Sequence, residues 1–120
     1  MGLLYSAFTY FLGFKVNSDE YKVMGLAPYG ETTSDETKRF VKIITSELVD
    51  IGQVGDIRLN TRHFKFMHDF HMIDPNDWEQ LFGIAMRLPS SPISQSHKNL
   101  AFAIQSVTED IACRLATWLK

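Results

Sequence analysis

The first residues of the chain carry a pattern of apolar positions around which the other segments are interpreted. From Leu3 to Phe14 nearly every position is apolar, and these side chains go all the way round a helical wheel. A helix that is apolar on all sides is normally buried in a larger body or a membrane. The run is too short to span a bilayer, which needs about 20 apolar residues, and it lacks the basic start and cleavage site of a signal peptide. We therefore expect a central helix over residues 2–12, stopped by Gly13, within a protein larger than this chain.

A short second helix is predicted next. Ser18 is a suitable N-cap residue, and acidic residues follow it in the first turn, where the helix dipole favours negative charge. Tyr21 and Met24 are expected on its buried side. The helix should end near Ala27, because Pro28 disfavours helical backbone at the residue before it.

A third helix and a β-hairpin are predicted after this pair. Thr33 and Glu36 form a T-x-x-E capping box that would open an amphipathic helix. Its buried positions would be Phe40, Val41, Ile44 and Leu48. Residues 57–70 then alternate between apolar and polar side chains, which favours a short β-hairpin or ribbon with Phe64, Phe66 and Phe70 on one side.

Two more helices complete the expected fold. Asp74 and Pro75 provide an N-cap and a first-turn proline for a short helix that ends at Gly83. A long last helix should begin near Ser94 or Ser96. Its apolar stripe would consist of Leu100, Ile104, Val107, Ile111, Leu115 and Trp118. These elements together predict an α+β fold that is mostly helical, with a short β-hairpin.

Composition narrows the range of partners. The 120 residues are 45% hydrophobic and 22% charged, which is ordinary for a globular domain, and the net charge is -2. The chain has no run of Lys or Arg, so we expect neither a nucleic-acid partner nor an anionic membrane surface. A single cysteine rules out an internal disulfide and is typical of a reducing, cytoplasmic location.

Two residues are interpreted from their positions in these helices. Gly25 lies inside the second helix, where it is about 1 kcal/mol less favourable than alanine, so we expect a backbone or a ligand to approach it closely. Cys113 lies in the last helix, where a buried and unreactive thiol is favoured over a nucleophile.

A group of metal-binding residue types occurs between the hairpin and the fourth helix. These residues are His63, His68, Asp69, His71 and Asp74. On an extended strand His68 would face away from His63 and His71, so the histidines do not converge. We therefore favour solvated polar positions over a metal site.

The last helix carries one polar pair that could face a partner segment. Gln105 and Glu109 lie one turn apart, beside Phe102. A simple surface pair, worth about 0.2–0.5 kcal/mol, is the favoured interpretation. The chain has no Walker A loop, no G-x-G-x-x-G and no G-x-S-x-G. No residue is therefore assigned a catalytic role.

Four ordered segments resemble one known family. GLLYSAFTYFLGFKVNSDEYKVMGLAPYGE resembles a signature of the O-carbamoyltransferase family, which includes nodulation-factor and antibiotic carbamoyltransferases. The resemblance continues in IRLNTRHFKF, in NDWEQLFG and in HKNLAFAIQSVTEDIACRLATWL. It covers almost the whole chain, which makes it far more specific than one motif.

The resemblance implies an activity for a longer parent protein. Family members have an N-terminal part with the actin-like ATPase fold and a C-terminal YrdC-like domain that makes carbamoyl-adenylate from carbamoyl phosphate and ATP. The carbamoyl group then passes to a hydroxyl of a small-molecule or sugar acceptor. The divalent metal of the family is bound upstream of this segment, and the glycine-rich nucleotide loop lies downstream.

The chain is accordingly interpreted as an internal fragment of the actin-like domain, and both ends look cut. Residues 1–30 would be the signature helices, 31–93 a helical and hairpin insertion, and 94–120 the long helix. The fragment should be inactive alone, hold no cofactor, and depend on the rest of the parent chain. The excised piece is expected to expose apolar surface and self-associate.

The resemblance also implies a nucleotide-binding side. The first helix matches the one that lines the nucleotide in tRNA-modifying relatives, but Leu3 and Ser6 replace their two acids. Lys22 fits a phosphate or carbamoyl contact as well as it fits a solvated lysine. The residues expected near the nucleotide are Gly2, Ser6, Glu20, Lys22 and Gly25. The alternatives are a relative that makes threonylcarbamoyl-adenosine in tRNA, against which the missing acids argue, and a non-catalytic helical interaction module.

Overall fold

The computed structural model describes the chain except for residues 1, 15–19, 53–56, 60–74, 88–91 and 119–120. The described residues form helices, two helical turns of other types and a two-stranded sheet. In chain order these are α1 (Gly2–Phe11), α2 (Glu20–Leu26), the 3₁₀ turn η1 (Ala27–Tyr29), α3 (Asp35–Ile43), the π-helical turn η2 (Ile44–Leu48), β1 (Val49–Ile51), β2 (Ile57–Leu59), α4 (Pro75–Phe82) and α5 (Gln95–Trp118). The described part is therefore α+β and mostly helical, with a short hairpin, as predicted.

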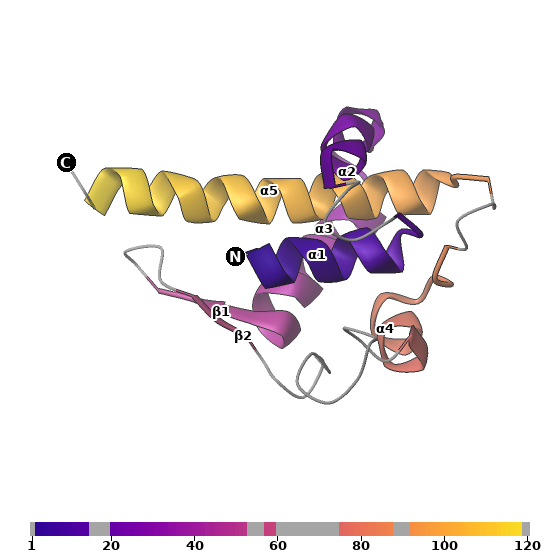
Figure 1. Ribbon diagram of the computed structural model, residues 1–120, viewed down its shortest axis with the longest axis horizontal. Coiled ribbons are helices and arrows are strands. Elements are labelled where there is room, and N and C mark those ends of the chain that lie inside the picture. Colours follow the sequence, from indigo (N-terminus) through magenta and orange to yellow (C-terminus); the bar gives the residue numbers. More distant parts are fainter. Residues whose placement is uncertain (1, 15–19, 53–56, 60–74, 88–91, 119–120) are drawn as a thin grey trace.

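Helix α5 is the element on which the others assemble. It lies along the longest axis of the molecule, and α1 runs beside it in the opposite direction (Figure 1). Helices α2 and α3 and the turn η1 also pack against α5. The hairpin lies near the C-terminal half of α5, where Arg114 donates from Nη1 to the carbonyl of Gly52 at 3.3 Å.

Helix α1 is buried by this arrangement, which explains its apolar pattern. Its buried side chains are Tyr5, Ala7, Phe8, Thr9 and Phe11. The helix ends as predicted before Gly13, whose φ is +81°. Arg87 lies over this end, donating its backbone N–H to Phe11 O at 3.1 Å and Nη1 to Leu12 O at 3.0 Å. A cation is favourable here because the last carbonyls of a helix carry partial negative charge.

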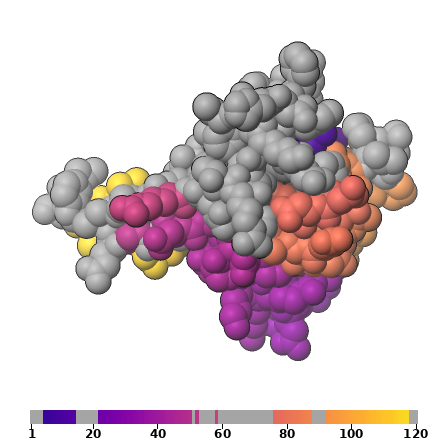
Figure 2. Space-filling view, turned by 90° about the horizontal axis from the view of Figure 1, so that it is seen from below, coloured from indigo at the N-terminus to yellow at the C-terminus, as the bar shows by residue number. Residues whose placement is uncertain are grey.

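Aromatic rings join α1, α3 and α4. Phe8 meets Trp78 edge-on with ring centroids 4.8 Å apart, and Phe82 lies 5.7 Å from both Phe8 and Phe40. Such edge-to-face pairs are worth about 0.5–1.5 kcal/mol each beyond their burial. Helices α3 and α4 adjoin on the face seen in Figure 2. Trp78, Phe82 and Phe40 are all fully buried, so this cluster is part of the main core.

The hairpin differs from its predicted position. Strand β2 pairs antiparallel with β1, so that Val49 lies opposite Leu59 and Ile51 opposite Ile57. The prediction placed the whole hairpin within residues 57–70 and continued a helix up to Leu48. Helical backbone does continue to Leu48, through α3 and η2. The chain then changes directly to strand β1, where β-branched residues at 49 and 51 favour extended backbone. Residues 60–70, with the predicted row of phenylalanines, lie outside the described part, as do His63, His68, Asp69, His71 and Asp74.

The N-cap of α3 is one residue later than predicted. Ser34, and not Thr33, is the cap: its Oγ accepts from Thr37 N at 3.1 Å. The first turn therefore contains Asp35 and Glu36 next to the positive end of the helix. The T-x-x-E capping box was wrong because Glu36 turns towards α5.

The exposure of three side chains was also predicted wrongly. Met24 is 52% exposed, whereas its neighbour Val23 is buried, and the side chain of Tyr21 lies outside the described part. Cys113 is exposed, and Leu115 is 39% exposed. Both lie in the last turns of α5, which extend beyond the helices that pack on its first half (Figure 1). Leu100, Ile104, Val107 and Ile111 of the predicted stripe are buried, and the side chain of Trp118 lies outside the described part.

Other element ends agree with the prediction. Helix α4 starts at Pro75 and stops before Gly83, whose φ is +74°. At the start of α5, Ser94 Oγ accepts from His97 N at 3.2 Å, which is the bond of an N-cap. The capping residues alone were therefore sufficient to predict these helix ends. Ser18, the predicted cap of α2, lies outside the described residues.

Candidate functional site

The turn that follows α2 lies directly on α5. A Cβ atom at Gly30 would stand 2.5 Å from Phe102 Cβ and 2.8 Å from Lys98 O, so only glycine fits there. The close approach of another backbone, one of the two alternatives predicted at Gly25, is absent from the described structure, because a Cβ there would meet nothing within 4 Å. Of these two glycines, Gly30 is therefore the one that the packing requires.

A buried amide fixes this turn on α5. Asn99 is 3% exposed, and its Oδ1 accepts from Glu31 N at 2.8 Å and from Gln95 Nε2 at 3.0 Å. Its Nδ2 donates to Glu36 Oε1 at 3.0 Å, and Ser96 Oγ donates to the other oxygen of that carboxylate at 3.0 Å. We call these five residues the Asn99 network. It joins α5 to the end of the signature segment and to the first turn of α3.

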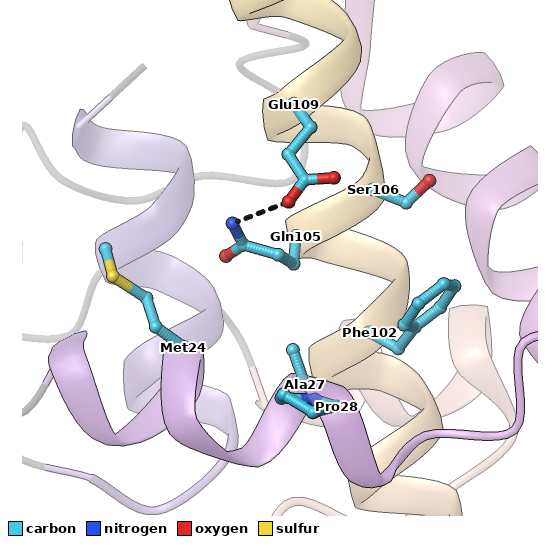
Figure 3. Close-up of a pocket in the computed structure, with 7 residues that line it drawn as sticks. All are labelled: Met24, Ala27, Pro28, Phe102, Gln105, Ser106 and Glu109. Carbon is cyan, nitrogen blue, oxygen red and sulfur yellow. Dashed lines mark hydrogen bonds between the residues drawn. The ribbon is translucent and has the colours of Figure 1, made fainter.

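A small cavity opens beside this contact, between α2–η1 and α5 (Figure 3). Its volume is about 220 Å³. Apolar side chains line it at Met24, Ala27, Pro28 and Phe102, and polar side chains at Gln105, Ser106 and Glu109. The wall is thus mainly apolar, with an amide and a carboxylate side by side on α5.

A residue of α1 orients the side-chain amide of Gln105, which lines the cavity. The hydroxyl of Tyr5, a residue only 7% exposed, donates to Gln105 Oε1 at 2.9 Å. The NH₂ group of Gln105 is thereby directed at Glu109, where Nε2 donates to Oε1 at 3.4 Å. The surface pair that the sequence predicted is present, but it also belongs to a chain of bonds that starts in the core.

The five residues predicted to be near a nucleotide lie on two neighbouring helices. Gly2 and Ser6 are in α1, and Glu20, Lys22 and Gly25 are in α2, which packs against α1. Ser6 is half-buried, whereas Lys22 and Gly25 are exposed. None of the five lines the cavity of Figure 3. That cavity and the predicted nucleotide side therefore share α2 but use different residues.

The part of the chain that the structure describes contains no group of three His, Cys, Asp or Glu residues able to hold a metal ion. Nor does any helix in the described ranges have the length and apolar character needed to cross a membrane.

Comparison with known proteins decides the family. The profile of the family described as carbamoyltransferase N-terminus matches residues 1–120. The chain belongs to this carbamoyltransferase family. It is also 45% identical over 115 residues to an uncharacterized protein of Synechocystis sp., an alignment that covers 96% of this chain and 18% of that relative. The carbamoyltransferase segment thus spans less than a fifth of the relative's length.

Sequence reasoning missed two features of this carbamoyltransferase segment. Asn99 lies four residues before Ala103 and eight before Val107, so it falls on the buried side of α5, where its amide needs partners. That spacing could have shown from the sequence that Asn99 is buried. Tyr5 was interpreted only as an apolar position, and its hydroxyl bond to a residue 100 positions away has no local signal.

Proposed function

We propose that this chain is part of an O-carbamoyltransferase that transfers a carbamoyl group from carbamoyl-adenylate to a hydroxyl of a small molecule or sugar. The match of the carbamoyltransferase N-terminus family to every residue of the chain carries this proposal. The parent would combine an actin-like ATPase domain, to which this chain contributes, with a YrdC-like domain that makes the adenylate from carbamoyl phosphate and ATP. The chain alone would be inactive.

The nucleotide side would be the outer surface of α2 with the adjoining end of α1. Gly25 supports this assignment: glycine is about 1 kcal/mol less favourable than alanine in a helix, and no neighbouring atom of the described structure requires it. A ligand that approaches the backbone is a reason for it. Lys22 is exposed on the same short helix, where an ammonium would attract a phosphate.

The divalent metal of the reaction would be held by the parent chain outside the described residues, since these contain no suitable group of ligands. No role for the metal is therefore derived from this chain. Its own part is to hold the exposed face of α2 at a fixed position on α5, through Gly30 and the Asn99 network.

The test uses the full-length gene product that contains residues 1–120. With ATP, carbamoyl phosphate and a divalent metal, it should release pyrophosphate and form a carbamate ester on a member of a panel of sugars and polyols, detected by mass spectrometry. Lys22→Gln should lower formation of the ester by about tenfold or more if the ammonium contacts a phosphate. Lys38→Gln, at an exposed lysine of α3, is the matched control. Absence of any carbamoyl-phosphate-dependent pyrophosphate release would refute the proposal.

A further inference from the structure

The cavity between α2–η1 and α5 presents a donor and an acceptor side by side. We infer that it binds a small neutral molecule that carries a primary amide, H₂N–C(=O)–, with the carbonyl on Gln105 and the NH₂ on Glu109. The inference goes beyond carbamoyl transfer and does not require it, because it rests only on the groups that line the cavity.

The orientation of Gln105 is the first step. Because the Tyr5 hydroxyl donates to Oε1, the carbonyl end of the amide is occupied, and the NH₂ end is directed at Glu109, which also lines the cavity. That group has two N–H donors, and one is directed at Glu109 across 3.4 Å, which is long for a hydrogen bond. The NH₂ group of Gln105 can therefore donate to a ligand oxygen at little loss.

Glu109 is the acceptor for the NH₂ group of the ligand. A carboxylate has about four acceptor positions, and the described contact with Gln105 uses one of them. Glu109 is exposed at the mouth of the cavity, and its carboxylate can accept N–H donors from a ligand.

These two groups discriminate between classes of ligand. A carboxylate or phosphate would accept from Gln105 but would be repelled by Glu109. An ammonium would satisfy Glu109 but would place its N–H groups against those of Gln105. A ketone or ester offers an acceptor without a donor. A primary amide offers both an acceptor and a donor, on the oxygen and the nitrogen that are bonded to one carbon.

The size and wall of the cavity limit the rest of the ligand. A volume of about 220 Å³ lies below the range of about 300–1,000 Å³ that holds drug-sized molecules. Met24 and Pro28 from α2–η1 and Phe102 from α5 make the rest of the wall mainly apolar. A short alkyl chain attached to the amide fits this wall, so propionamide is a suitable probe.

The test follows the methyl resonance of Met24, which lines the cavity, in the full-length gene product labelled with ¹³C-methyl methionine. Met24→Leu identifies the signal by its loss. Propionamide should shift it with a dissociation constant in the millimolar range, as for a fragment of this size. 2-Butanone, which has a methyl in place of the NH₂, should bind about tenfold more weakly, and propionate and propylamine more weakly than propionamide.

Variants assign the contacts. Glu109→Ala should weaken propionamide binding about tenfold, whereas Asp110→Ala, at the neighbouring exposed carboxylate paired with Arg114, should leave it unchanged. Tyr5→Phe should weaken the binding of both propionamide and 2-butanone relative to the unaltered protein, because it frees the amide of Gln105, which donates to the carbonyl of either ligand, to rotate. Equal affinity for propionamide and 2-butanone, tighter binding of 1-propanol, or no shift of the Met24 methyl would each overturn the inference. All three comparisons are made on the unaltered protein without turnover, so they are independent of carbamoyl transfer.

Discussion

At the scale of single residues, two glycines of the signature have opposite roles. Gly30 is required by the packing of the turn on α5, and Gly25 is not required by any described neighbour. Both occur within six residues of the same segment, and from the sequence a close approach was expected at Gly25 and not at Gly30. Space around a backbone position depends on segments far away in the chain, here residues 98 and 102, so it cannot be read locally.

Substitution of these glycines should change stability in opposite directions. Gly30→Ala should reduce the free energy of unfolding by about 1–3 kcal/mol, because the added methyl overlaps Phe102 and Lys98 O. Gly25→Ala should raise it by about 0.5–1 kcal/mol, because a helix favours alanine. Urea unfolding of residues 1–120 followed by circular dichroism measures both. A stabilising Gly30→Ala would show that the turn does not pack as described.

At the scale of elements, local capping chemistry predicted most helix ends. Gly13, Pro75, Gly83 and Ser94 all act where their residue types indicated. The rotation of α2 and the partner of β2 were predicted wrongly, because both depend on contacts with other elements. The buried side of a seven-residue helix with apolar side chains at positions 21, 23, 24 and 26 is not determined by its own pattern.

The N-cap of α3 offers a sharp test at this scale. Ser34→Ala removes the hydroxyl that accepts from Thr37 N and should cost about 1 kcal/mol of stability. Thr33→Ala, one residue earlier at an exposed position, should change stability by less than about 0.5 kcal/mol. The urea midpoints of unfolding of the two variants measure the difference. Equal losses of stability in the two variants would contradict Ser34 as the N-cap.

At the scale of the whole molecule, one aromatic cluster holds α1, α3 and α4 together. Phe82 contacts the rings of Phe8, Phe40 and Trp78, and it is fully buried. Phe82→Ala should therefore cost about 3–5 kcal/mol, a large part of the stability of a domain of this size. Gln80→Ala, on the exposed side of the same helix, is the control. Near-wild-type unfolding of Phe82→Ala would show that α4 is not part of the core.

The exposed end of α5 predicts self-association of residues 1–120 when they are expressed alone. Leu115 and Cys113 are exposed there, on turns that project beyond the other helices. Sedimentation analysis should detect a dimer that Leu115→Glu weakens and that Thr117→Glu, at a polar exposed position nearby, affects less. A monomer at all concentrations would contradict this prediction.

Two long-range hydrogen bonds, one of them in the Asn99 network, have a consequence for folding while the chain is being synthesised. Glu31 is bonded to a side chain 68 residues later in the chain, and Tyr5 to one 100 residues later. A ribosome releases the signature segment long before either partner exists. The first helix, apolar on every side, must therefore wait for α5 to emerge before it is covered, and in that interval it is the segment most in need of a chaperone.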